Sequence, residues 1–229
     1  MSLRIAAVVP VLDEAPRVAG ALAPLLAEAC EVMVADGGSG DGSPAQARAA
    51  GATVIDAPRG RALQMNAGAA ALAPGWDAVI FVHADTRLPA GWAALVDEAL
   101  RAGAAWGRFD VRLDSPRWLL RGVGAMMNWR SRLTGICTGD QAIFLSATAW
   151  RAVGGYPAIP LMEDIALSAA LRRSAGRPAA LRPPALTSAR RWERHGALRT
   201  IVLMWSLRLR YFLGESPQRL HRRYYGPRP

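Results

Sequence analysis

One stretch of the sequence decides the fold class: residues 4–36 read RIAAVVPVLDEAPRVAGALAPLLAEACEVMVAD. Residues 4–11 and 31–35 are short apolar runs rich in β-branched side chains, as buried parallel strands are. Between them, Pro16 stands where the first turn of a helix tolerates proline. Apolar residues then recur on one face of a predicted helix, which Pro24 should kink: Val18, Ala21, Leu22, Leu25, Leu26 and Ala29. The stretch therefore predicts two parallel strands joined by a right-handed helical crossover.

The same alternation continues outward from this stretch. Short apolar runs predict further strands at 53–55 and 78–82, and periodic apolar spacing predicts helices at 43–50, 61–72 and 89–102. Repeated units of this kind predict an α/β fold in which helices flank a mostly parallel central sheet.

The second half of the chain is less regular. The patterns predict strands at 106–113 and 142–145 and helices at 118–133, 147–153, 163–174 and 197–213. Because no repeat or long linker interrupts the chain, we predict one domain, residues 1–195, and a C-terminal arm, residues 196–229. The arm is expected to be an amphipathic helix followed by a frayed tail from residue 226.

Composition narrows the class of protein. The chain has 229 residues, 52% of them hydrophobic, which suits a globular domain with its own core. Its two cysteines, Cys30 and Cys137, cannot form a disulfide framework or a thiolate zinc site, so a reducing cytosol is expected. We expect no membrane span and no signal peptide, because charged residues interrupt every apolar run.

The charge is distributed unevenly between the two halves. Residues 1–100 carry 6 Arg and 11 Asp or Glu, whereas residues 101–229 carry 22 Arg and 7 Asp or Glu. The chain contains no lysine. This asymmetry indicates that the second half meets anions, which could be phosphates, an anionic membrane surface or nucleic acid.

Polar residues follow three of the predicted strands. Asp13 and Glu14 follow the first, Asp36 ends the second, and His83 and Asp85 follow the strand at 78–82. Ligands of parallel α/β sheets bind beyond the carboxyl ends of the strands, so these residues are expected to share a site. Asp85 can hold a hard cation such as Mg²⁺ or Mn²⁺ with substrate phosphates, the alternative being a helix cap. His83 alone is more typical of a packed histidine than of a ligand.

Three further segments carry candidate chemistry, each with a plain structural alternative. Arg61 begins a predicted helix and could share an anion with its N-terminus, or belong to a solvated loop. Glu163 and Asp164 could be a general base and its orienting partner, or merely two acids that a helix start favours. Arg190 and Arg191 suit bidentate phosphate binding, or a solvated basic face.

Together these motifs resemble the family 2 glycosyltransferases, which have the GT-A nucleotide-diphosphosugar transferase fold. The resemblance covers roughly residues 3–195 and rests on five segments in order: VPVLDE at 9–14, ADGGSGDG at 35–42, HAD at 83–85, GDQ at 139–141 and ED at 163–164. Asp13 replaces the usual Asn, and His83 replaces the first Asp of a D-x-D motif. Residues 59–66 and 188–192 further resemble a bacterial subgroup, the arsenosugar-biosynthesis-type or radical-SAM-associated glycosyltransferases.

The resemblance implies an inverting, metal-assisted transfer from a nucleotide-diphosphate sugar to the hydroxyl of a small-molecule or lipid-linked acceptor. It implies Asp164 as catalytic base, with Glu163 beside it, and Asp85 as ligand of Mn²⁺ or Mg²⁺. The residues implied to bind the nucleotide sugar are Pro10, Asp13, Glu14, Asp36, Arg61, Asp85, Asp140, Gln141, Arg190 and Arg191.

Two other functions compete with this interpretation. A nucleotidyltransferase would share the α/β layout, but it would need a basic, glycine-rich loop after the first strand, where residues 11–16 are acidic and lack glycine. A nucleic-acid-binding protein would suit the basic second half, but the first half is acidic and carries no recognised motif. We therefore expect no nucleic acid partner.

The predicted helix at 197–213 has an apolar stripe. Its members are Leu198, Ile201, Val202, Trp205, Leu209 and Phe212. An apolar stripe flanked by arginine is typical of a helix lying in an anionic membrane interface, which would place a cytoplasmic protein peripherally on the inner face of the membrane. Packing on the domain or on a second copy of the chain, as a homodimer, is the alternative.

Overall fold

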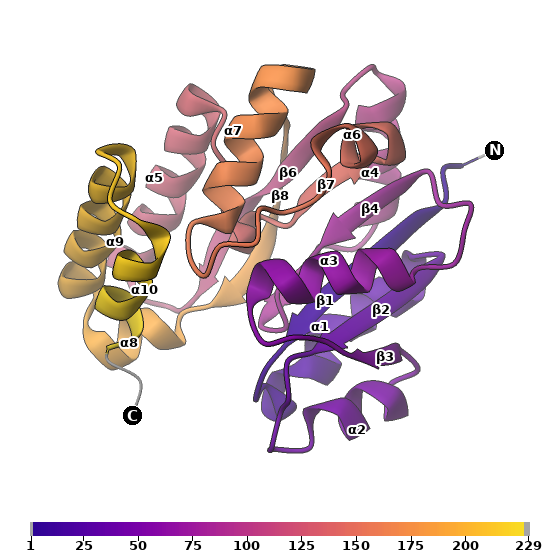
Figure 1. Cartoon of the computed structure of the whole chain (residues 1–229), viewed down its shortest axis with the longest axis horizontal. Coiled ribbons are helices and arrows are strands. Elements are labelled where there is room, and N and C mark those ends of the chain that lie inside the picture. The colour runs from indigo at the N-terminus through magenta and orange to yellow at the C-terminus, as the bar shows by residue number, and fades with distance from the viewer. Residues whose placement is uncertain (1, 227–229) are drawn as a thin grey trace.

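The computed structural model describes residues 2–226 and contains a central eight-stranded sheet (Figure 1). The strand order is β3-β2-β1-β4-β7-β6-β8-β5. In chain order the strands are β1 (Ile5–Val11), β2 (Glu31–Asp36), β3 (Thr53–Asp56), β4 (Ala78–Phe81), β5 (Thr86–Arg87), β6 (Trp106–Asp114), β7 (Ile143–Ser146) and β8 (Ala179–Ser188).

The sheet has a parallel half and a mixed half. Strands β3, β2, β1 and β4 are all parallel, as the first half of the sequence predicts. Strand β7 then runs antiparallel to both β4 and β6, β6 is parallel to β8, and β5 is antiparallel to β8. A mixed sheet with flanking helices is an α/β fold, as the sequence predicts.

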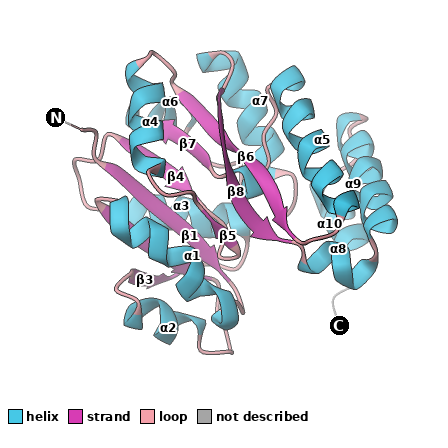
Figure 2. Cartoon of the chain, turned by 180° about the vertical axis from the view of Figure 1, so that it is seen from behind, coloured by secondary structure: helices cyan, strands magenta, loops and turns pink. Residues whose placement is uncertain are grey.

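Helices cover both faces of the sheet (Figures 1 and 2). They are α1 (Ala15–Glu28), α2 (Ser43–Ala49), α3 (Arg61–Ala71), α4 (Trp92–Arg101), α5 (Trp118–Thr134), α6 (Ala147–Val153), α7 (Glu163–Ala175), α8 (Arg190–His195), α9 (Ala197–Phe212) and α10 (Pro217–Tyr225), with a 3₁₀ turn η1 (Gly139–Gln141). Helix α1 continues through Pro24, so the proline does not end it.

Strand β1 is buried along its whole length because helices pack on both of its faces. Its odd-numbered side chains, from Ile5 to Val11, share a core with α1, α2 and α4, and Ala6 and Val8 share a second core with α3, α6 and α7. A Cβ on Gly68 would lie 2.5 Å from Val8 Cγ1, so this glycine allows α3 to approach β1 closely. Two-sided burial explains the unbroken apolar run at 4–11.

Five of the described elements were not predicted from the sequence: β5, β8, α8, α10 and the 3₁₀ turn η1. Strand β8 contains Pro183 and Pro184, which argue against a strand inside a sheet. The structure accommodates them at a register shift, where Asp110 of β6 pairs with Pro184 directly after Phe109 pairs with Leu181. An irregularity in the ladder relieves the loss of two backbone donors.

The C-terminal helices pack against the rest of the chain. Leu207 of α9 and Leu220 of α10 share a buried cluster with Leu161 and Met162, which precede α7. The predicted division at residue 195 remains a prediction, and most of the tail expected to fray, residues 227–229, lies outside the described residues. No helix in the described part of the chain is both long and apolar enough to cross a bilayer.

Candidate active site

A cavity of about 750 Å³ opens beyond the carboxyl ends of β1 and β4. Its other walls come from η1, the start of α7 and the helices α8, α9 and α10. Most of the predicted site residues line it: Pro10, Asp13, Glu14, Arg61, Asp85, Asp140, Glu163, Asp164, Arg190 and Arg191. Asp36 and Gln141 do not line it.

The glycine-rich turn after β2 is tied to the end of β1. Asp36 is buried, and its carboxylate accepts hydrogen bonds from the backbone N–H groups of Gly38 and Ser39, both at 2.9 Å. The Ser39 hydroxyl accepts the Asp13 N–H, and the Gly40 N–H donates to the Asp13 carboxylate. Asp36 thus supports the loop that presents Asp13, which has a left-handed φ of 53°. Contact between Asp36 and a nucleoside stays a prediction.

Two amides of α3 connect segments of the cavity wall. Gln64 Nε2 donates to the carbonyl oxygens of Val11 and Ala35 at 2.7 and 2.9 Å, which joins the ends of β1 and β2. The Asn66 amide exchanges two hydrogen bonds of 2.8 Å with the backbone of Tyr156, in the loop that leads to α7. Gln64 and Asn66 both belong to the segment 59–66. Their side-chain amides hold the ends of β1 and β2 and the loop before α7 in place.

The segment after β4 brings His83 and Asp85 to the cavity. Asp85 is half-buried, and burial raises the pKa of its carboxyl group. His83 Nδ1 lies 3.3 Å from Asp140 Oδ1. A Cβ on Gly139 would lie 2.3 Å from His83 Nε2, so the glycine lets the imidazole pack directly against η1.

These side chains fit a divalent cation that a nucleotide helps to hold. In the described chain, no group of three or more His, Cys, Asp or Glu side chains could hold a metal ion by itself. Mg²⁺ and similar hard cations commonly take one or two protein carboxylates and complete their shell with phosphate oxygens and water. The Asp85 carboxylate, with the His83 imidazole beside it, is a donor set of that shared kind.

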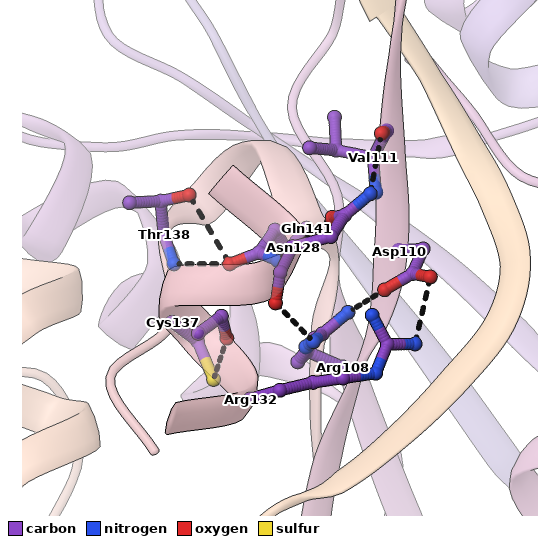
Figure 3. Close-up of polar contacts among 9 residues, drawn as sticks. Arg108, Asp110, Val111, Asn128, Arg132, Cys137, Thr138 and Gln141 are labelled. Carbon is purple, nitrogen blue, oxygen red and sulfur yellow. Dashed lines mark hydrogen bonds and ion pairs between the residues drawn. The ribbon is translucent and has the colours of Figure 1, made fainter. Parts of the chain in front are cut away.

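A hydrogen-bond network behind η1 positions Asp140 (Figure 3). Asn128 of α5 makes two hydrogen bonds with the backbone of Val111 in β6, at 2.8 and 3.0 Å. Gln141 Nε2 donates to Asn128 Oδ1 at 3.4 Å, and Gln141 Oε1 accepts the Thr138 N–H at 3.2 Å. Gln141 is fully buried and does not line the cavity, and these hydrogen bonds let it position η1. Contact between Gln141 and a nucleotide sugar stays a prediction.

Helix α7 begins with two carboxyl groups in different surroundings. Met162 precedes them with a left-handed φ of 71°, which turns the chain into the helix. Glu163 is 5% exposed, and burial together with the charge of Asp164 raises its pKa. Asp164 is half-buried, and its Oδ2 accepts the Gly139 N–H at 2.9 Å. Asp164 is therefore the better placed of the two to take a proton from a bound hydroxyl group.

The predicted phosphate-binding arginines differ in their pairing. Arg190 forms an ion pair with Glu14, with 2.6 Å between Nη2 and Oε1. The Arg191 guanidinium lies over the Tyr224 ring, 3.6 Å from its centroid, as in a cation–π contact. Arg191 has no hydrogen-bond acceptor among the described residues, so its donors can meet a ligand, whereas Arg190 shares the Glu14 carboxylate with Arg17.

The sequence matches a family model over the segment that supplies β1, β4 and η1 to this site. The model is that of glycosyl transferase family 2, and it matches residues 6–148. The chain belongs to glycosyl transferase family 2. It is therefore an enzyme that transfers sugars. The match favours this function over the nucleotidyltransferase and nucleic-acid-binding alternatives. A search of curated proteins finds no match. The arsenosugar-type subgroup remains a prediction.

Solved glycosyltransferase structures share the fold. Glucosyl-3-phosphoglycerate synthase from Mycobacterium tuberculosis, in complex with Mn²⁺, UDP and glucosyl-3-phosphoglycerate, superimposes with a TM-score of 0.61 at 17% identity, over 81% of this chain and 72% of that one. A mannosyltransferase from Pyrobaculum calidifontis, in complex with GDP-Man and Mn²⁺, gives 0.59 at 20% identity, over 82% and 57%. At these identities the likeness establishes the fold.

The C-terminal wall of this glycosyltransferase site was not predicted. His221, Tyr224 and Tyr225 of α10 line the cavity, as do Met204 and Arg208 of α9. The spacing of Leu220 and Tyr224, one helical turn apart, was the available signal for a packed helix beyond residue 213. Which side of that helix would meet the site depends on packing between distant segments, which no local pattern shows.

Proposed function

We propose that this glycosyltransferase moves a sugar, with inversion, from a nucleotide-diphosphate sugar to an acceptor hydroxyl. The observation that carries the proposal is the Asp164 carboxylate, which lines the same cavity as Asp85 and is held by the Gly139 N–H. One positioned base and one cation-binding carboxylate are what a single displacement at an anomeric carbon requires.

On the acceptor side, Asp164 acts as general base. As the acceptor oxygen bonds to the anomeric carbon, its proton passes to the Asp164 carboxylate and the bond from that carbon to the diphosphate oxygen breaks. Inversion follows because the attack and the departure take place on opposite faces of the sugar. Glu163, whose pKa burial raises, is the second carboxyl group to test.

On the donor side, Asp85, with His83 beside it, would hold Mn²⁺ or Mg²⁺ when the nucleotide sugar binds. When bound, the cation offsets the negative charge that grows on the leaving diphosphate. Arg191 adds a hydrogen-bonding cation at the same cavity, and Asp13 and Glu14 lie where the nucleoside would bind at the end of β1.

The first experiment is a panel of nucleoside diphosphates and nucleotide sugars, read out as the shift in Tm with Mn²⁺ or with EDTA. A ligand that needs the cation stabilises the protein more with Mn²⁺. Asp85→Asn should remove that difference, whereas Asp114→Asn, at an exposed carboxylate on β6, should keep it. An Mn²⁺-dependent shift that survives Asp85→Asn would show that Asp85 is not the ligand.

We further propose that the enzyme lies on the cytoplasmic face of an anionic membrane, where it could reach a lipid-linked acceptor. Most of the exposed large apolar side chains in the described chain belong to α5 and α9, which lie side by side (Figures 1 and 2). This apolar face consists of Trp118, Trp129, Leu133, Leu198, Val202, Trp205, Leu209, Phe212 and Leu213. Phe212 is 89% exposed, so the stripe on α9 does not pack on its own domain; Ile201 alone turns inward.

Charge supports a lipid surface as the partner of this face. Exposed arginines flank it on both helices: Arg117, Arg121, Arg199 and Arg210. Apolar side chains with flanking cations favour insertion among anionic headgroups. A second copy of the chain would instead place these cations opposite one another.

Vesicle co-sedimentation at physiological salt tests this placement. The protein should pellet with phosphatidylglycerol vesicles and not with phosphatidylcholine vesicles, and Trp205→Ser with Phe212→Ser should abolish pelleting. Leu63→Ser, at an exposed apolar residue on α3, is the matched control and should pellet normally. Failure to pellet, together with a concentration-dependent dimer that the double variant loses, would assign the face to a second copy.

A further inference from the structure

Two arginines near the proposed base have no partner in the described chain. Arg208 of α9 lines the cavity and is half-buried, yet it forms no ion pair or hydrogen bond with any described residue. Arg130 of α5 lies close by, and its Nη2 is buried without a hydrogen-bond partner among the described residues. A buried guanidinium without partners is costly, so its presence calls for an explanation.

The surroundings of the two guanidinium groups show how unfavourable the ligand-free arrangement is. Burial and the charge of Arg208 lower the pKa of Arg130 to about 10. Burial also lowers the pKa of Arg208, against the opposing effect of the Asp164 and Asp140 charges. Two like charges held close together and partly buried repel, and an anion beside them would offset both the repulsion and the cost of burial.

These two arginines are separate from those at the diphosphate end of the cavity. Arg190 is paired with Glu14, and Arg191 lies over Tyr224. Arg130 and Arg208 come instead from α5 and α9, and both are close enough to Asp164 for its charge to affect their pKa values. The unmatched positive charge therefore lies beside the proposed base, where an acceptor hydroxyl must be.

We propose that the acceptor carries an anionic group, a phosphate or a carboxylate, which Arg208 binds from the cavity wall, with the charge of Arg130 behind it, while the acceptor hydroxyl faces Asp164. Guanidinium groups bind such oxyanions through paired hydrogen bonds. This inference rests on the proposed function, because it assigns the acceptor class of the same site. A soluble phosphate ester and a phospholipid headgroup share this chemistry.

The test is calorimetric titration of glycerol 1-phosphate, with glycerol as the neutral probe. The protein is first saturated with Mn²⁺ and the nucleoside diphosphate that binds best in the panel, so that the diphosphate subsite is filled. If no nucleotide binds, the proposed function fails, and the same titration into the free protein still tests the arginines. Dihexanoyl phosphatidic acid in a parallel titration distinguishes a lipid headgroup, which should bind more tightly, from a soluble ester.

The expected result is that glycerol 1-phosphate binds, glycerol does not, and Arg208→Gln weakens binding about tenfold or more, as loss of a charge-assisted contact does. Arg199→Gln, an exposed arginine on the same helix that does not line the cavity, should change the affinity less than about twofold. Without ligand, Arg208→Gln should have an unchanged or higher Tm, because it removes an unpaired cation.

Three results would overturn the proposal. They are no binding of glycerol 1-phosphate to the parent protein, unchanged affinity in both Arg208→Gln and Arg130→Gln, and equal weakening in Arg199→Gln. An unchanged or higher Tm of Arg208→Gln would exclude loss of folding as the cause of weaker binding. As a second control, Arg208→Gln should bind the nucleotide as tightly as the parent protein does.

Discussion

The two halves of this molecule bring different chemistry to one cavity. The first half carries a net negative charge. Its parallel strands end at the proposed donor side of the cavity, where Asp13, Glu14 and Asp85 lie. The second half, which is strongly basic, supplies Asp164 from α7 and arginines from α8 and α9. The comparison shows that the proposed donor side is built at the ends of parallel strands, whereas the proposed acceptor side is built by η1 and the helices of the second half.

Long-range hydrogen bonds hold both sides of the cavity. On the proposed donor side, the Gly40 N–H donates to Asp13, 27 positions away, and Gln64 donates to the Val11 carbonyl, 53 positions away. On the acceptor side, Asp164 is held by Gly139, 25 positions away, and η1 depends in turn on Asn128 and β6. Changes in the second half should therefore affect chemistry and packing together.

The largest expected effect is that of Asp164→Asn on sugar transfer. Asparagine can still accept the Gly139 N–H but cannot take up a proton, so transfer should fall about a hundredfold or more. Nucleotide binding should be nearly unchanged, because the donor half does not depend on this carboxylate. Single-turnover transfer and calorimetric nucleotide titration measure the two quantities.

Glu163→Gln is the matched control for that variant. If it lowers transfer as much while Asp164→Asn turns over normally, then Glu163 is the base. Loss of nucleotide binding in Asp164→Asn would instead show that the two halves are not functionally separate.

An intermediate effect is expected where the halves meet, at Gly139. In Gly139→Ala the new Cβ would overlap the His83 ring at 2.3 Å, which should reduce the free energy of unfolding by about 1–3 kcal/mol. His83→Ala removes the obstacle, so the double variant should recover part of the loss in a double-mutant cycle. Denaturant unfolding measures the free energy of unfolding of each variant. If the losses of the two single variants simply add in the double variant, Gly139 and His83 are not in contact.

The smallest effect is expected at Asp41, in the turn of the donor half. Hydrogen bonds from the Ser43 hydroxyl and the Ala15 N–H lower the pKa of this exposed carboxyl group. Its contribution to stability is therefore present above the unfolded pKa of about 4 and is lost as the pH falls through the lower folded value. Asp41→Asn should flatten the acid limb of Tm against pH slightly, and an identical limb would contradict this.

The sequence by itself determined the parallel half of the sheet and the class of the site. Apolar runs such as 4–11 are readable because β1 is covered on both faces, and strand-end acids such as Asp13 and Asp85 meet because parallel strands end at one edge. The apolar stripe of α9 was likewise visible from its spacing alone.

Tertiary structure alone decided the rest. It showed that Gln141 is buried behind the cavity, that α10 closes one wall, and that β8 tolerates Pro183 and Pro184 at a register shift. It also placed Arg130 and Arg208 together beside Asp164, although 78 positions separate them in the chain. Periodicity reports which face of an element is apolar; which distant element covers that face, and whether a charge finds a partner there, depends on long-range packing.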